Sequence, residues 1–146
     1  MQDTPAHRAI ASLQRLCEAF AQRRRQLAAQ ANLTETQWRV LEEVAGEGFL
    51  PSMFARRRAI SAAAVSRVLR QLLDRRLVHS SIGTSDGRQR LYRLTAKGGR
   101  VLQKIDDARE SATRGVWKSL PKSSLDEFSR FSEELARRLE AYDEAR

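Results

Sequence analysis

Apolar side chains recur mostly at three- and four-residue steps over residues 4–30, and no proline follows Pro5 in this segment. Such spacing predicts one long amphipathic helix. The positions on its apolar face are Ile10, Leu13, Leu16, Cys17, Phe20 and Leu27. A similar stripe near the end of the chain predicts a long last helix, which a capping box of Ser124 and Glu127 would begin. The apolar positions of that helix are Leu125, Phe128, Phe131, Leu135, Leu139 and Tyr142.

Three shorter helices are predicted between these two arms. Thr34 and Gln37 have the spacing of a capping box and begin the first of them. Pro51 suits the first turn of a short second helix. Ser61 caps a third helix that runs to about Arg76. The apolar face of this third helix has helical spacing and consists of Val65, Val68, Leu69 and Leu72.

The next segment is typical of a β-hairpin. Residues 77–82 and 89–94 are expected to form short strands, because residues 83–88 between them are rich in turn formers. A further helix begins at Thr95 and ends before Pro121. This order predicts a mainly α fold with a small β-hairpin wing. In such a winged helix-turn-helix one helix enters the major groove of DNA and the preceding helix braces it.

The basic residues are concentrated in the middle of the chain. The formal net charge is +9, and residues 49–100 hold twelve basic residues against only Asp74 and Asp86, a net of +10. Residues 1–48 are neutral overall, and residues 101–146 have a net charge of −1. A concentrated basic block indicates a polyanion-binding element, and nucleic acid is the commonest such partner. Because the block coincides with the predicted helix-turn-helix and hairpin, we expect double-stranded DNA as the partner.

We therefore expect three parts, with residues 1–32 as an N-terminal dimerisation helix, 33–100 as the DNA-binding lobe and 101–146 as C-terminal dimerisation helices.

Arginine to guanine is the commonest specific protein–DNA contact, although an arginine-rich helix face can also be an ordinary solvated surface. The candidate DNA contacts on and beside the helix after Ser61 are Ser61, Ala62, Ala63, Ser66, Arg67 and Arg70. Further candidates are Arg56, Arg57 and Arg58 before this helix, which would contact phosphates, and Arg90 in the hairpin.

Several segments resemble the MarR family of bacterial winged helix-turn-helix transcriptional regulators, over roughly residues 10–140. They are residues 33–41 (LTETQWRVL), residues 60–69 (ISAAAVSRVL), and the wing residues 86–88 (DGR) followed by 94–98 (LTAKG). The last pair is the most specific, because the family's wing carries Asp-x-Arg followed by a Leu-Thr-x-x-Gly helix entry. The resemblance implies a homodimeric repressor that binds a pseudo-palindromic operator and is often released by a small phenolic compound or an oxidant.

The resemblance gives the wing residues Asp86 and Arg88 a role. Asp86 would hold the Arg88 guanidinium extended, so that it enters a narrow and negative minor groove. The alternative is a polar turn, since aspartate and glycine favour turns in any case. The sequence also departs from the family, because Ala62 and Ala63 stand where many members carry polar side chains. Ala59 stands where glycine is common.

The segment 33–41 is closest to regulators of aromatic-acid catabolism, which implies a small aromatic carboxylate as the effector. The candidates for an effector pocket between the arms and the lobe are Arg15, Leu16, Phe20, Trp38, Arg39 and Phe49, with the two arginines facing the carboxylate. Aromatic residues at helical spacing are equally compatible with a plain core. Cys17 is either a small apolar residue of the helix or the sensor of an oxidant-sensing repressor.

The sequence contains no constellation of catalytic residues, phosphate-binding loop or metal-ligand spacing, so we expect a protein that is not an enzyme and needs no cofactor. A single cysteine and the lack of a signal peptide or a long apolar stretch predict a cytoplasmic chain without a membrane span. Two other classes stay open, namely a nonspecific architectural nucleic-acid-binding protein and a helical protein-interaction module. The latter leaves the basic block unexplained.

Overall fold

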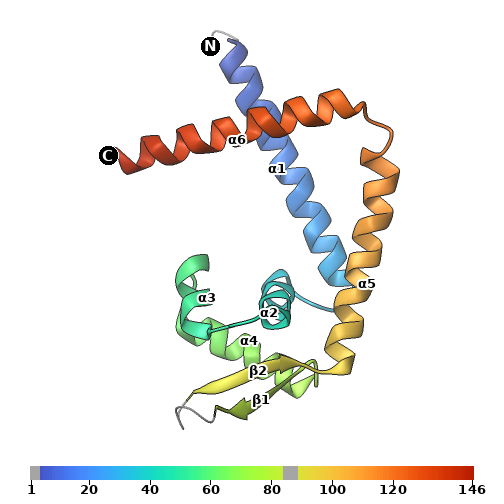
Figure 1. Cartoon of the computed structure of the whole chain (residues 1–146), viewed down its shortest axis with the longest axis vertical. Coiled ribbons are helices and arrows are strands. Elements are labelled where there is room, and N and C mark those ends of the chain that lie inside the picture. Colours follow the sequence, from blue (N-terminus) through green and yellow to red (C-terminus); the bar gives the residue numbers. More distant parts are fainter. Residues whose placement is uncertain (1–3, 84–88) are drawn as a thin grey trace. The chain divides into compact units, whose positions relative to one another are not determined.

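The computed structural model describes residues 4–83 and 89–146. Within these residues it contains six α-helices, one π-helical turn and a two-stranded antiparallel sheet (Figure 1). In chain order the elements are α1 (Pro5–Gln30), α2 (Glu35–Ala45), α3 (Pro51–Arg58), α4 (Ala62–Asp74), β1 (Val78–Ile82), β2 (Arg90–Leu94), α5 (Ala96–Ala112), η1 (Thr113–Trp117) and α6 (Lys122–Glu144). The predicted fold class, mainly helical with a hairpin wing, is confirmed.

Side-chain caps begin α2 and α4 at the residues that the sequence predicts. The Thr34 hydroxyl accepts a hydrogen bond from the Gln37 backbone N–H at 3.1 Å, and the Gln37 side-chain oxygen accepts from the Thr34 N–H at 2.9 Å. The Ser61 hydroxyl accepts from the Ala64 N–H at 3.0 Å at the start of α4. These bonds satisfy amides that the first turn of a helix leaves without an intrahelical partner.

Left-handed residues end three of the helical segments. Asn32, Ala59 and Arg76 have φ angles of 55°, 52° and 58°. Glycine is favoured in this conformation because it has no Cβ atom to clash with the backbone. The left-handed turn at Arg76 explains why α4 ends at Asp74, two residues before the end that the pattern predicts.

The last helix begins earlier than the sequence predicts. Helix α6 starts at Lys122, directly after Pro121, and no side-chain cap is present. The predicted capping box of Ser124 and Glu127 is therefore wrong, because both residues lie inside the helix. The physical reason is Pro121, whose ring fixes φ at a value compatible with a helix start, here −59°.

A core of fully buried side chains joins α2, α3, α4 and the hairpin. The largest of these side chains are Trp38, Phe54, Leu41, Leu72 and Leu77. The predicted apolar face of α4 is buried in full, namely Val65, Val68, Leu69 and Leu72. One polar contact adds to this packing, because the Gln37 amide nitrogen on α2 donates to the Gln71 amide oxygen on α4 at 2.9 Å. This bond connects α2 directly to α4 beside the apolar core.

The hairpin is connected tightly to the helices on both sides. β1 and β2 pair in the register that sets Val78 opposite Leu94. The Thr95 N–H donates to the Leu77 carbonyl at 3.1 Å, and the Thr95 hydroxyl donates to the Arg76 carbonyl at 2.6 Å. The residue that begins α5 thus also binds the backbone between α4 and β1.

The chain divides into two compact units, of which the first ends at Ala108 and the second is Arg109–Arg146. The second unit contains α6, whose large exposed apolar side chains are Phe128, Phe131, Leu139 and Tyr142. In the first unit, α1 exposes Ile10, Leu13 and Phe20. These side chains belong to the two stripes that the sequence predicts. Exposed apolar surface of this kind marks an interaction site when it forms a continuous patch.

Candidate nucleic-acid interface

The solvent side of α4 carries the predicted base contacts. All of these residues are exposed, namely Ser61, Ala62, Ala63, Ser66, Arg67 and Arg70. Within the described part of the chain, neither Arg67 nor Arg70 forms an ion pair or a hydrogen bond through its side chain. Because the opposite face of α4 is buried, only this face is available to a partner. It combines two guanidinium groups with small side chains that allow close approach to base edges.

Three exposed arginines lie in the last turn of α3, just before α4. Arg57 donates to the Glu43 carboxylate on α2 at 2.9 Å, and Arg58 lies 3.8 Å from the same carboxylate. Arg56 is exposed as well. Positive side chains are favourable at the carboxyl end of a helix, and here two of them are held toward α2. The predicted phosphate contacts are thus grouped at one helix end, with Glu43 as a neighbour that the sequence analysis did not identify.

The wing is described only in part. Asp86 and Arg88 lie outside the described residues, so their predicted roles stay predictions. Arg90 is exposed at the start of β2, opposite Ile82 of β1. The wing strand therefore presents at least one of the predicted cationic contacts to solvent.

Two basic residues of the middle block stabilise the fold instead. The Arg75 guanidinium donates to the Asn32 carbonyl at 2.6 Å, between α4 and the turn before α2. The Lys97 ammonium donates to the Arg75 carbonyl at 3.1 Å. Charge counting could not separate these residues from DNA contacts. The relevant signal is their position at a helix end, where unpaired carbonyl groups accept cationic donors.

Three of the predicted effector residues lie on α1. Arg15 and Phe20 are exposed, and Leu16 is half-buried. Cys17, the candidate redox residue, is exposed on the same helix. In the single chain this part of α1 is therefore open to solvent.

The other effector candidates lie in the lobe, and each of them has different surroundings. Trp38 is only 1% exposed, and the Arg24 guanidinium stacks 4.2 Å from its ring centre. Arg39 is half-buried. Phe49 makes edge-to-face contacts with Phe54 and Tyr92. The six candidates are thus not gathered around one cavity in a single subunit.

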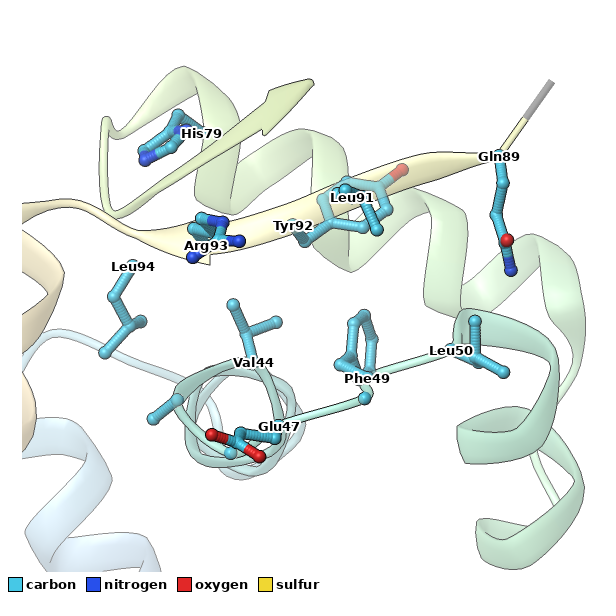
Figure 2. A pocket seen from close by; sticks show the side chains of 13 residues that line it. Val44, Glu47, Phe49, Leu50, His79, Gln89, Leu91, Tyr92, Arg93 and Leu94 are labelled. Atoms are coloured by element: carbon cyan, nitrogen blue, oxygen red, sulfur yellow. The ribbon is translucent and has the colours of Figure 1, made fainter. Parts of the chain in front are cut away.

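Two cavities among the described residues lie within the first unit. The larger has a volume of about 640 Å³ and lies between β2 and the segment that joins α2 to α3, as Figure 2 shows. Of the predicted effector residues, only Phe49 lines it. The smaller cavity, about 70 Å³, lies between α1 and α5, beside Leu27 and Ile105. Ligand pockets are typically about 300–1,000 Å³, so only the larger cavity has room for an aromatic acid.

The described part of the chain was also compared with the requirements of a metal site and of a membrane span. Residues 4–83 and 89–146 contain no group of three or more metal-ligating His, Cys, Asp or Glu side chains. None of the described helices has the length and apolar character needed to cross a membrane. Hydrogen bonds from Arg137 and Arg138 on α6 lower the pKa of Glu134, which is exposed and belongs to a surface ion-pair cluster.

Known proteins share this sequence pattern and this fold. Residues 31–89 match the MarR family model, whereas no curated protein matches the sequence significantly. One similar solved structure is a MarR family transcription regulator with a TM-score of 0.84 and 14% identity, which covers 95% of this chain and 93% of the other. Another is Staphylococcus aureus MarR in complex with salicylate and kanamycin, with a TM-score of 0.75, 18% identity and coverages of 92% and 91%.

A third solved structure is a mutant of S. aureus MepR bound to an oligodeoxyribonucleotide. It has a TM-score of 0.65 and 16% identity, and the match covers 90% of this chain and 97% of that protein. The family match spans α2, α3, α4 and β1, and the shared fold extends along almost the whole chain. Residues 31–89 of the chain are therefore similar to the MarR family, and the chain shares its fold with solved MarR-type structures.

Proposed function

We propose that this protein is a sequence-specific DNA-binding transcriptional repressor. The observation that supports this most directly is the exposed face of α4, where Arg67 and Arg70 have no side-chain partner among the described residues. The buried opposite face orients these arginines outward, and Gln37 of α2 holds the helix from behind. The arginines at the end of α3 supply phosphate contacts, which position the protein without reading sequence.

The repressor acts as a homodimer on a pseudo-palindromic operator. Helices α1 and α6 expose apolar stripes, and pairing with a second copy would remove both from water. A two-fold symmetric dimer presents two copies of α4, and half-sites about one helical turn of DNA apart match that symmetry. In this proposal residues 1–32 and 101–146 form the dimerisation helices, and residues 33–100 form the DNA-binding lobe.

A small aromatic carboxylate is the proposed effector of the dimer. Support comes from the structural similarity to S. aureus MarR, which was solved with salicylate. Because Arg15, Leu16 and Phe20 lie on an open part of α1, a second subunit would have to complete their pocket, with Trp38 and Arg39 from the lobe. Exposed Cys17 makes oxidant sensing the alternative, in which peroxide releases DNA from the wild type and not from Cys17→Ser.

DNA binding is tested by fluorescence anisotropy with a duplex from the promoter beside the gene, compared with a scrambled duplex. We expect affinity to fall steeply with salt, by about 0.9 log unit per log unit of salt for each phosphate contacted. Arg57→Ala should weaken both duplexes equally. Arg67→Ala should also reduce the difference between them.

Two outcomes would contradict the proposal. A salt dependence close to zero would exclude a role for the basic block in phosphate binding. Equal affinity of the wild type for specific and scrambled duplexes, over every promoter tested, would favour the nonspecific architectural protein, because specific regulators typically prefer their site by about 10³-fold or more.

A further inference from the structure

Ala63 lies opposite the buried face of α4. That face consists of Val65, Val68, Leu69 and Leu72. At about 100° per residue, Ala63 points almost directly away from the middle of it. Arg67 and Arg70 follow Ala63 at four and seven residues, so they lie on the same side of the helix. All three side chains are exposed. The exposed face of α4 therefore carries a methyl group in line with two guanidinium groups.

The fold does not require an apolar side chain at position 63. Because Ala63 is exposed, a polar residue there would cost no packing in the core. The cap of the helix is already formed, since the Ser61 hydroxyl accepts a hydrogen bond from the Ala64 N–H at 3.0 Å. The first turn of α4 contains no acidic residue, although negative side chains stabilise that end of a helix. A partner surface that disfavours acidic and polar side chains accounts for this composition.

A methyl group at this position discriminates between base edges. Thymine alone presents a methyl group in the major groove, and an alanine side chain makes apolar contact with it. A hydrogen-bonding base edge covered by the alanine would lose its water without gaining a partner, which costs free energy. Alanine therefore favours thymine at the position that it covers. The guanidinium of Arg67, about one helical turn further on, is suited to bidentate hydrogen bonds with guanine.

We propose that Ala63 selects a thymine in each operator half-site, through contact between its methyl group and the C5-methyl group of that base. This assignment rests on the proposed DNA-binding function and names a specificity-determining residue within it. Four residues of a helix rise about 6 Å, and successive base pairs of DNA lie about 3.4 Å apart. The thymine therefore lies within about two base pairs of the base that Arg67 contacts.

The test begins with selection of binding sequences from a random duplex library by the full wild-type chain. Each thymine of the selected operator is then replaced in turn by deoxyuridine, which lacks only the C5-methyl group, and affinity is measured by fluorescence anisotropy. At one thymine per half-site the replacement should weaken binding about fourfold, the contribution of one buried methyl-sized group. Replacement of that thymine in both half-sites should weaken binding about fifteenfold.

Two glycine variants assign the effect to one residue. Ala63→Gly removes the methyl group on the protein side and should abolish the difference between thymine and deoxyuridine. Ala62→Gly is the matched control, because it makes the same change in the same turn of α4. Ala62 lies at the edge of the exposed face, three residues before buried Val65, so this variant should keep the difference. Each variant is compared with itself on two duplexes, so the loss of helix stability that glycine causes cancels from the ratio.

Three results would overturn the assignment. They are selected half-sites that contain no thymine, equal affinity for thymine and deoxyuridine at every position, and a difference that Ala63→Gly retains. Each of them can occur in a protein that selects an operator, so each is distinct from failure of the proposed function. A chain that enriches no sequence from the library would disprove the proposed function, and this assignment with it.

Discussion

Gly98 on α5 lies against the backbone of Leu77, so closely that a Cβ atom at position 98 would overlap the Leu77 carbonyl oxygen. Gly98 is buried in the first turn of α5, where its N–H donates to the Thr95 hydroxyl at 3.0 Å. The same Leu77 carbonyl accepts the Thr95 N–H. The Leu-Thr-x-x-Gly motif therefore joins the hairpin to α5, and its glycine is required by packing.

Gly98→Ala should destabilise the lobe by about 1–3 kcal/mol, the usual cost of inserting a methyl group where there is no space. Gly99→Ala is the matched control, because nothing lies within 4 Å of its Cβ position. Alanine is a better helix former than glycine, so the control should be stabilised by about 0.5–1 kcal/mol. Urea unfolding followed by circular dichroism measures both. Equal stability of the two variants would show that the backbones move apart at little cost.

Ala59→Gly should stabilise the protein. Ala59 has a φ of 52°, and the left-handed conformation costs an L-residue about 1–2 kcal/mol. Glycine removes this cost but loses about 0.4–1 kcal/mol through the greater entropy of the unfolded chain. We therefore expect a net gain of up to about 1 kcal/mol, visible as a higher Tm in calorimetry. A lower Tm would mean that contacts of the Ala59 methyl group stabilise the protein by more than the left-handed conformation costs.

Glu43→Gln should tighten binding to every duplex. The Glu43 carboxylate holds Arg57 at 2.9 Å and adds a negative charge beside the proposed phosphate contacts. Its removal frees the arginine for DNA, and the lost surface ion pair costs at most about 1 kcal/mol of stability. Anisotropy at two salt concentrations should give a several-fold gain and a steeper salt dependence. Weaker binding would instead make Glu43 a residue that positions Arg57 for its phosphate.

Phe131→Asp should convert the proposed dimer to a monomer and abolish operator binding. Phe131 on α6 is 62% exposed in the single chain. A dimer interface formed by the apolar stripe would bury this side chain. Ser129→Asp introduces the same charge on the same helix, outside the apolar stripe, and should leave the dimer intact. Sedimentation at micromolar concentration distinguishes the two. A wild-type chain that sediments as a monomer would contradict the dimer directly.

Asp86→Ala should weaken operator binding, although it removes a negative charge. In the proposed wing, Asp86 orients the Arg88 guanidinium and so reduces the entropy lost when the arginine enters the groove. The expected loss is about 1 kcal/mol, the scale of one hydrogen bond to a charged group. Arg88→Ala should weaken binding more, most of all where the minor groove is narrow. Binding is measured by anisotropy at fixed salt. Tighter binding by Asp86→Ala would show that Asp86 is only a turn residue and does not orient Arg88.

The helices and the hairpin could be predicted from the sequence because local signals decide them. Helical spacing located the buried face of α4, and the capping pair Thr34 and Gln37 located the start of α2 to the residue. The errors arose where two local signals competed. Ser124 and Glu127 have the spacing of a capping box, but Pro121 already supplies a helix start three residues earlier.

The candidate site could be predicted only in part, because charge patterns do not record tertiary contacts. Arg67 and Arg75 look alike in the sequence, yet the first is exposed without a side-chain partner in the described chain and the second binds a carbonyl group. The Glu43 carboxylate and the cavity beside Phe49 depend on segments that meet only in the folded lobe. The spacing of apolar residues along the sequence does not predict which distant segments come into contact.

The double role of Gln37 has a consequence for hydrogen exchange. Its amide oxygen caps its own helix, and its amide nitrogen holds Gln71 on α4. One planar group cannot rotate to improve either bond without breaking the other. Opening the first turn of α2 therefore also removes this bond to α4, and we expect the amide protons near both ends of the bond to exchange together. The proposed DNA-contacting helix would thus share part of its local stability with the cap of the helix behind it.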